Sequence, residues 1–250
     1  MTIVFLTALG VGGATILGAI LGFIFRRITN KTNDLFLSFA AGVMLSAAFF
    51  GLIIPSLGDG DIFSVTVCIS GIFSGALLIN FLDKLTPHLH KLTGIDNPAS
   101  FDAGRYDKVI LFVLAIAIHN IPEGIAAGVS FGTGNTKEAL TVAFGIALQN
   151  LPEGMVIIAP MLSLGMSKTR TLLSAFATGA VEILGTLLGY FAIRISETIL
   201  PFALAFAGGT MLYVICNEMI PDTHSHGCKN SVSYAFLAGF SLMVCMNFLI

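Results

Sequence analysis

Eight long apolar stretches dominate this sequence of 250 residues. A helix needs about 20 mostly apolar residues to cross the hydrocarbon core of a bilayer. Segments of roughly that length lie at 2–25, 34–55, 62–86, 108–131, 138–163, 170–193, 198–220 and 232–249. We therefore expect an all-α polytopic membrane protein, with eight transmembrane helices that form one domain over residues 1–250.

The composition agrees with a membrane protein and excludes several other classes. Only 10% of the residues are charged, whereas a soluble domain usually carries about a quarter. The net charge of -2 and the absence of a basic patch make nucleic acid an unsuitable partner. The four cysteines are scattered, so we predict neither a disulfide framework nor a thiolate metal site. The apolar N-terminus lacks the basic leader of a signal peptide and reads as a retained span.

The basic residues indicate the orientation in the membrane. Ten of the 12 Lys and Arg residues fall in or beside the first, third, fifth and seventh connections between the expected spans. Cytoplasmic connections are enriched in Lys and Arg. We therefore expect a plasma-membrane protein with both termini outside and with the long polar connection 87–107 in the cytoplasm.

One short motif occurs twice in the middle of the chain. It reads IHNIPEG at 118–124 and LQNLPEG at 148–154, inside the fourth and fifth apolar stretches. Consecutive spans run in opposite directions, so the two copies form an inverted pair. Inverted repeats with a polar site near the membrane midplane are a recurring plan of transporters.

The spacing within the motif groups its polar side chains. His119 and Glu123 lie one helical turn apart, and Asn120 is a further neighbour of Glu123 at i, i+3. In the second copy, Gln149 and Asn150 flank Glu153 in the same way. If the two helices pack together, the two glutamates can bridge a pair of adjacent metal positions.

The prolines and glycines of the motif have their own expected effects. Pro122 and Pro152 lack an N–H, so a backbone carbonyl one turn earlier loses its helical partner in each copy. Backbone of this kind is tolerated at membrane depth where it lies within protein or faces water. We expect Gly124 and Gly154 to leave room beside each glutamate.

Glu182 is a third carboxylate at membrane depth. Each ionised carboxylate at the bilayer centre costs about 2.5–3.5 kcal/mol on insertion scales, or on the order of 10 kcal/mol for three. No Lys or Arg lies at their depth in the sequence, so a bound cation is the simplest compensation. The structural alternative is a set of protonated glutamates that hydrogen-bond to Asn and Gln between helices.

The ligand types indicate the metal. Imidazole with carboxylates suits zinc, and also iron(II), manganese or cobalt, whereas calcium and magnesium favour sites made only of oxygen. Zinc is the expected cargo, and no catalytic cofactor is expected.

These residues resemble the ZIP (Zrt-, Irt-like) family of metal transporters, in its prokaryotic GufA-like branch. Besides the two motifs, the resemblance includes SFAAGVML at 38–45, LDKLTPH at 82–88 and EMIP at 218–221. It implies a 3+2+3 arrangement of helices, a homodimer, and import of zinc, cadmium and related divalent metals into the cytoplasm.

The resemblance also implies two sets of metal ligands. The first position would use Met44, His119, Glu123, Gln149 and Glu153, and the second would use Asn120, Asn150 and Glu182 with the two shared glutamates. Some family members have aspartate where this chain has Asn150, and the amide removes a charge from the second position. From the sequence alone, Met44 would be packing material in an apolar helix; only the resemblance makes it a ligand.

A second polar cluster is expected at the cytoplasmic ends of the third and seventh spans. If those ends are neighbours, the cluster would receive metal that leaves the midplane; its members are Asp83, His88, Glu218, Asp222 and His224, with His90 and His226 as exposed or transient contacts. The alternative is a solvated, charged helix terminus.

Two other functional classes remain as alternatives to metal import. An intramembrane metalloenzyme, either a protease or a di-metal carboxylate enzyme, would want His-Glu-x-x-His or paired Glu-x-x-His motifs, and neither occurs in the chain. Transport of protons or organic solutes through the same carboxylates is the third possibility.

Overall fold

The structure is a computed structural model that describes residues 1–24, 29–92, 117, 120–163, 166–195, 197–224 and 229–249. Within these ranges the chain is helical and contains no strand. Among the described residues, six helical segments are long and apolar enough to cross a membrane: Thr2–Ile24, Lys31–Ser56, Ile62–Leu82, Lys168–Arg194, Leu200–Thr223 and Asn230–Leu249. The expectation of an all-α polytopic membrane protein is therefore confirmed at this level.

The helices follow the apolar stretches closely. Residues 120–129 are helical within the fourth stretch, and α6 fills the fifth with 28 residues. The principal elements are α1 (Thr2–Ile24), α2 (Asn30–Ala48), α3 (Ile54–Ser56), α4 (Ile62–Leu92), α6 (Thr136–Ser163), α7 (Lys168–Ile195), α8 (Leu200–Val214), α9 (Ile220–Thr223) and α10 (Lys229–Leu249).

One predicted boundary is wrong. The long polar connection was expected to begin at residue 87, but α4 continues to Leu92. Residues 87–92 therefore extend the third helix by more than a turn, in spite of Pro87. The apolar pattern marks where a helix can lie in hydrocarbon, and it gives no signal for a polar extension beyond it.

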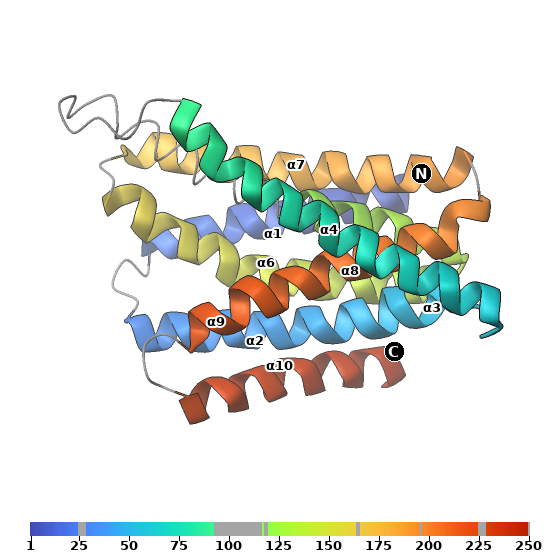
Figure 1. Ribbon diagram of the computed structural model, residues 1–250. Coiled ribbons are helices and arrows are strands. Elements are labelled where there is room, and N and C mark those ends of the chain that lie inside the picture. Colours follow the sequence, from blue (N-terminus) through green and yellow to red (C-terminus); the bar gives the residue numbers. More distant parts are fainter. Residues whose placement is uncertain are drawn as a thin grey trace.

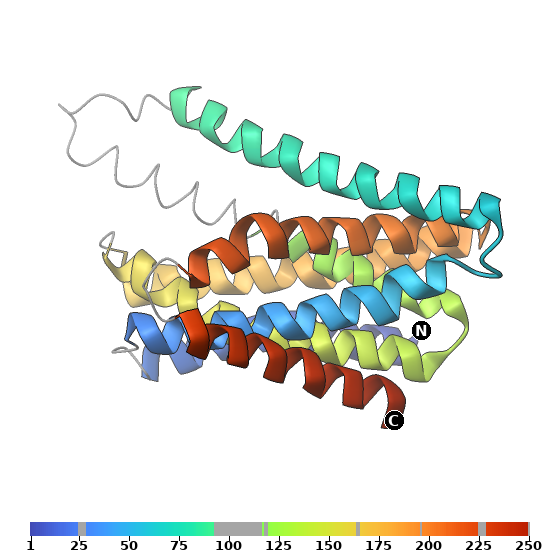
Figure 2. The ribbon, with the colours of Figure 1, turned by 60° about the horizontal axis from the view of Figure 1, so that its bottom comes forward.

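The helices pack lengthwise into one bundle (Figure 1). α1 packs mainly against α6 and α7, while α4 packs against α8 and α10 against α2. Both termini lie at the same end of the bundle, on the right in Figures 1 and 2. The ends of α4, α6 and α9 lie at the opposite end, on the left.

Two helices contain a widened turn just before a proline. The π-helical segments η1 (Phe49–Ile53) and η4 (Ile215–Met219) precede Pro55 and Pro221, which lie in α3 and α9. A proline ring clashes with the carbonyl one turn earlier, and a π turn is one way to absorb this clash. In contrast, α6 continues through Pro152 without a change of helix type. Among the described residues, the backbone adjustment occurs in α2–α3 and α8–α9 and is absent from the second copy of the motif.

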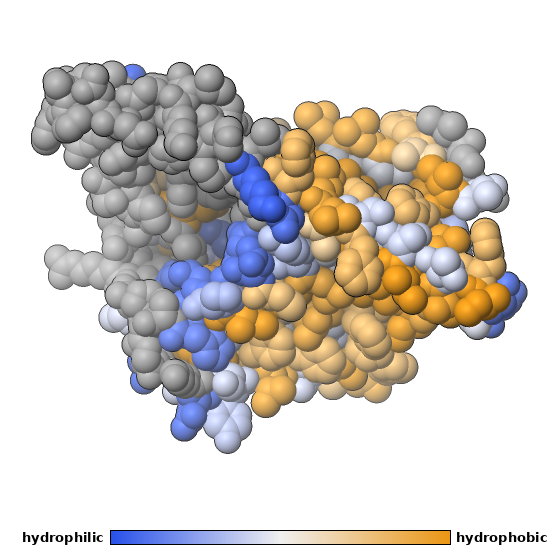
Figure 3. All heavy atoms as spheres, viewed as in Figure 1, coloured by the Kyte–Doolittle hydropathy of each residue, from blue (hydrophilic) through white to orange (hydrophobic). Residues whose placement is uncertain are grey.

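The surface is consistent with a lipid environment. Apolar side chains cover the middle and right of the face in Figure 3, and hydrophilic ones gather toward the left end. Large hydrophobic residues such as Phe73 and Leu188 are about two-thirds exposed, at 65% each. Outside the spans, Asp61 accepts a hydrogen bond from the Ser64 N–H at 2.8 Å near the start of α4. Hydrogen bonding to Ser64 lowers the pKa of the Asp61 carboxyl.

Candidate metal centre

A cluster of polar side chains lies buried between four helices. It combines residues 120–129 with α1, α6 and α7. The buried members are Thr15, Asn120, Glu123, Gln149, Asn150 and Glu182, each at most 2% exposed. Five of these six residues were predicted from the sequence. The structure thus brings the two copies of the motif and the third carboxylate together.

Glu182 has hydrogen-bond donors on both carboxylate oxygens. Its Oε1 accepts from the hydroxyl of Thr15 at 2.8 Å and from Nδ2 of Asn120. Its Oε2 accepts from Nδ2 of Asn150 at 2.8 Å. The same Asn150 nitrogen contacts the carbonyl oxygen of Val11 at 3.2 Å. This carboxylate is therefore held by neutral donors from α1, α6 and the 120–129 helix.

Glu123 is held less completely. Nε2 of Gln149 donates to its Oε1 at 2.8 Å. Three buried oxygens of the cluster have no hydrogen-bond donor among the described residues: Oε2 of Glu123, Oε1 of Gln149 and Oδ1 of Asn150. A buried polar atom without a partner carries a desolvation cost. A cation bound to these oxygens would remove that cost.

Among the described Lys and Arg side chains, none is buried beside the charges of the cluster. Glu123 lies near enough to both Glu153 and Glu182 for electrostatic repulsion. All six Lys and Arg residues whose side chains the structure describes are exposed. The described side chains also form no group of three or more His, Cys, Asp and Glu in metal-binding geometry. The centre is thus a mixed carboxylate and amide cluster in the part of the chain that is described.

The remaining predicted ligands of the centre differ in how far the structure describes them. His119 lies outside the described residues. Glu153 is half-buried on α6. Met44 is 1% exposed on α2, in an apolar cluster that includes Ile146 and Met211. Its burial fits both packing and metal ligation.

The predicted cytoplasmic cluster is described only in part. Asp83 and His88 fall on α4, but their side chains lie outside the described set, as does His226. Glu218 is half-buried in η4 and Asp222 is exposed on α9. Nδ1 of His224 lies 2.9 Å from the carbonyl oxygen of Ile220. A carbonyl can only accept, so Nδ1 donates in this contact, and in the neutral imidazole the lone pair then lies on Nε2.

The glycines of the motif have a different role from the one expected. A Cβ added to Gly124 would overlap the backbone of Glu182, and one added to Gly154 would overlap the carbonyl of Thr15. These glycines allow close approach between helix backbones, and they do not simply leave space beside the glutamates. Small residues at such positions are typical of transmembrane helix packing.

Sequence reasoning missed Thr15 and the participation of α1. A threonine in an apolar helix carries no signal by itself. The sequence does contain a second internal repeat that includes Thr15: residues 12–22 (GGATILGAILG) resemble residues 179–189 (GAVEILGTLLG). Glycines coincide at three positions, and Thr15 aligns with Glu182.

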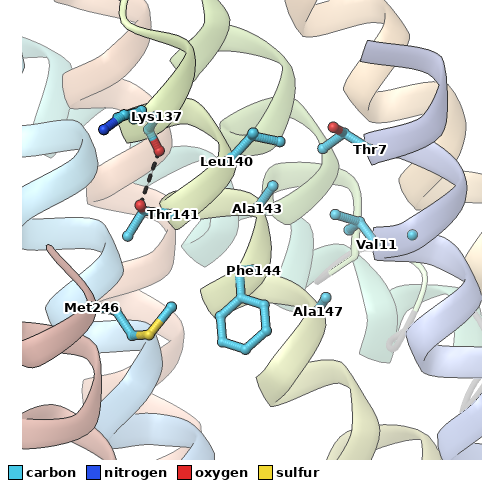
Figure 4. A pocket seen from close by; sticks show the side chains of 10 residues that line it. Thr7, Val11, Lys137, Leu140, Thr141, Ala143, Phe144, Ala147 and Met246 are labelled. Carbon is cyan, nitrogen blue, oxygen red and sulfur yellow. Dashed lines mark hydrogen bonds between the residues drawn. The ribbon is translucent and has the colours of Figure 1, made fainter. Parts of the chain in front are cut away.

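A separate cavity of about 440 Å³ opens between α1, α6 and α10 near the termini (Figure 4). Its lining is mainly apolar and includes Val11, Phe144 and Met246. The Thr141 hydroxyl donates to the Lys137 carbonyl within α6 at 2.9 Å. The described lining residues include no carboxylate, imidazole or thiolate side chain.

Comparisons with known proteins identify the family. A sequence model of the family described as "ZIP Zinc transporter" matches residues 97–247. The chain is 38% identical to the zinc transporter ZIPB of Bordetella bronchiseptica, over 94% of this chain and 77% of that protein. It is 34% identical to the zinc transporter GufA of Myxococcus xanthus, over 94% of each chain. It is also 34% identical to the zinc transporter ZupT of an Enterobacter species, over 97% of this chain and 95% of that protein. The buried carboxylate and amide cluster, the membrane-spanning helices and these matches together show that the chain belongs to the ZIP family of zinc transporters.

Proposed function

We propose that this protein imports zinc, and with it related divalent metals, across the plasma membrane into the cytoplasm through a paired site in the buried cluster. The ZIP family is a family of transporters and not of enzymes. The metal-transporter interpretation is therefore favoured over the intramembrane metalloenzyme. No catalytic step is assigned to the cluster.

The observation that carries the proposal is the buried pair of carboxylates with no buried Lys or Arg among the described side chains. Glu123 and Glu182 are 2% and 0% exposed, and the described Lys and Arg side chains are all exposed. Ionised carboxylates at this depth need compensation. A divalent cation supplies it reversibly, which is what a transported ion requires.

The proposed ligands divide into two positions. The first uses the bridging glutamates Glu123 and Glu153 with Gln149, and His119 and Met44 complete it. The second uses Asn120, Asn150 and Glu182 beside the same glutamates. Unpartnered oxygens on Glu123 and Gln149 support the first position. In the second position, Nδ2 of Asn120 and Nδ2 of Asn150 both donate to Glu182, so metal binding by Glu182 requires these bonds to rearrange. Oδ1 of Asn150 has no donor among the described residues.

The proposed architecture has eight spans in a 3+2+3 arrangement. α4 packs against α8 and α10 packs against α2, as expected if the first and last three spans are equivalent halves. The contacts also correspond: Gly75 meets the backbone at Phe206, and Gly239 meets it at Phe39. An inverted repeat of this kind allows alternating access around a fixed central pair of helices. The homodimer that the family resemblance implies is part of the same proposal.

The proposed orientation places both termini outside. Asp59, between α3 and α4, would then be extracellular, and Ser167, before α7, would be cytoplasmic. With the native cysteines replaced, Asp59→Cys should react with an impermeant thiol reagent on intact cells. Ser167→Cys should react only after permeabilisation. The reverse pattern would show that the proposed topology is inverted.

Metal leaving the centre would pass toward the cytoplasmic ends of α4 and α9. Glu218 and His224 support this route, with Asp83 and His88 as proposed partners on α4. The available Nε2 of His224 is the specific feature that favours an exit ligand over a merely solvated helix end.

Sealed vesicles that contain the purified protein provide the test. We expect zinc to fill them, without formation of any product. Glu123→Ala combined with Glu153→Ala should abolish filling, while the double variant still inserts into the membrane. Asp59→Ala combined with Glu138→Ala removes two exposed carboxylates and is the matched control. Normal zinc filling by the first double variant would disprove the site. Filling with protons or an organic solute in place of zinc would support the third functional class.

A further inference from the structure

Thr15 stands at the centre of the cluster, although nothing in the ligand pattern of the family resemblance includes it. It lies on α1, is 1% exposed, and donates its hydroxyl to Oε1 of Glu182 at 2.8 Å. Three helices therefore supply donors to one carboxylate: α1 through Thr15, the 120–129 helix through Asn120, and α6 through Asn150. Thr15 is the only one of these three donors that lies outside the repeated motif.

Thr15 and Glu182 occupy equivalent places in the two halves of the molecule. They are 167 residues apart, and the same spacing relates Gly12 to Gly179, Gly18 to Gly185 and Gly22 to Gly189. Gly12 and Gly179 lie where α1 and α7 meet. The other four glycines lie where α1 meets α6 or where α7 meets the 120–129 helix.

The contacts with the repeated motif correspond as well. Gly154 of the second copy abuts the backbone of Thr15, and Gly124 of the first copy abuts the backbone of Glu182. Gly18 abuts the carbonyl of Leu151, and Gly185 abuts that of Ile121. Each copy of the motif therefore meets one member of the Thr15–Glu182 pair in the same way. The two side chains meet each other between the halves.

We propose that Thr15 is a positioning residue of the second metal position. In the first half of the molecule it supplies a hydroxyl at the place where the second half supplies the carboxylate of Glu182. The inference rests on the proposed function, because it assigns Thr15 a role in metal binding by Glu182. A hydroxyl at this place fixes Oε1 of Glu182 without adding charge. A carboxylate there would add one more negative charge beside Glu123, Glu153 and Glu182.

The consequence for zinc is geometric. With Oε1 held by Thr15 and Asn120, the Oε2 edge of Glu182 is the one that faces Asn150 on α6. Loss of the hydroxyl removes one of the two donors to Oε1 and leaves the orientation of the carboxylate to Asn120 and Asn150 alone. Partners that orient a metal ligand typically change metal affinity about 10- to 100-fold when they are removed.

Three single variants test the positioning role. Thr15→Val keeps the shape and removes the donor, and Thr15→Ser keeps the donor and removes a methyl group. Thr178→Val is the matched control, because this buried hydroxyl on α7 donates to the Ala175 carbonyl within its own helix. Zinc binding to the purified protein is measured by titration calorimetry, and the KM and maximal rate of zinc filling are measured in vesicles.

We expect Thr15→Val to weaken zinc binding at one of two sites by about 10- to 100-fold, while Thr15→Ser and Thr178→Val retain wild-type binding. Wild-type affinity in Thr15→Val overturns the inference. Equal losses in Thr15→Val and Thr15→Ser also overturn it, because they would assign the methyl group a packing role. If wild-type vesicles do not fill with zinc, the proposed function fails; if they fill and Thr15→Val fills with unchanged KM, only the positioning role fails.

An exchange of the two side chains tests their equivalence. Glu182→Thr alone should lose the affected zinc site. The double variant Thr15→Glu/Glu182→Thr restores one carboxylate and one hydroxyl across the same interface, so we expect it to recover zinc binding relative to Glu182→Thr. A double variant that is folded by size-exclusion chromatography and binds no more zinc than Glu182→Thr overturns the equivalence. Recovery has no explanation in a purely structural role for Thr15.

Discussion

Gln149 on α6 donates from Nε2 to Oε1 of Glu123 at 2.8 Å, and this bond joins the two copies of the motif. The bond links unlike partners, because the residue at the place of Gln149 in the first copy is His119. It fixes one oxygen of Glu123 and leaves Oε2 without a donor among the described residues. The arrangement orients Glu123 while keeping an oxygen available for metal.

Removal of this bond should weaken zinc capture. In Gln149→Ala, Glu123 loses the donor that orients it, and we expect the KM for zinc to rise about 10- to 100-fold. The measurement is the initial rate of vesicle filling against zinc concentration. Thr141→Val on the same helix removes a hydroxyl that bonds only within α6, and it should leave the KM unchanged. An unchanged KM in Gln149→Ala would mean that Glu123 is oriented by other groups.

Adjacent glycines on α1 should respond differently to the same substitution. A Cβ on Gly12 would overlap the carbonyl of Gly179 on α7, whereas a Cβ on Gly13 would meet nothing within 4 Å. We expect Gly12→Ala to destabilise the protein by about 1–3 kcal/mol or more through overpacking. Gly13→Ala should leave the stability unchanged or raise it, because alanine favours a helix. Thermal unfolding in detergent measures both, and equal melting temperatures would contradict the close approach of α1 and α7.

The amino-acid pattern was sufficient for the helices and for five of the six buried residues of the centre. Apolar length located α1, α2, α6, α7, α8 and α10, because hydrocarbon thickness fixes how many apolar residues a span needs. The repeated motif located Glu123 and Asn150, because polar groups at membrane depth are rare and require a partner. The third carboxylate, Glu182, was found for the same reason.

Other features depend on tertiary contacts and had no such signal. Thr15 is chemically inconspicuous until α1 is packed against α6 and α7. The π turns before Pro55 and Pro221 look no different in sequence from the continuous α-helix at Pro152. The polar C-terminal end of α4 could not be predicted from apolar length, because its residues are not apolar. For Thr15 the deciding quantity is a contact between distant segments.

Met44 offers a test that separates ligation from packing. Leucine keeps its volume and usually costs less than about 1.5 kcal/mol in a core, but it removes the thioether sulfur. Because sulfur is a soft ligand, Met44→Leu should reduce cadmium uptake more than manganese uptake if Met44 binds the metal. Met211→Leu is the matched control, since Met211 is fully buried in the same apolar cluster. Competition between the two metals in vesicles is the measurement, and an identical change for both metals would leave Met44 a packing residue.

Substitution of His224 tests whether this residue is an exit ligand or part of a solvated helix end. Its Nδ1 donates to the Ile220 carbonyl, which turns the lone pair of Nε2 away from that bond. Metal reaches this residue after it leaves the centre, so His224→Ala should lower the rate of zinc filling at saturating zinc severalfold and leave the KM nearly unchanged. Tyr234→Phe is the control, because this exposed side chain near the start of α10 lies outside the predicted cluster. If His224→Ala fills vesicles at the wild-type maximal rate, the cluster is a solvated terminus. If the KM rises as it does in Gln149→Ala, His224 acts on capture at the centre and not on release.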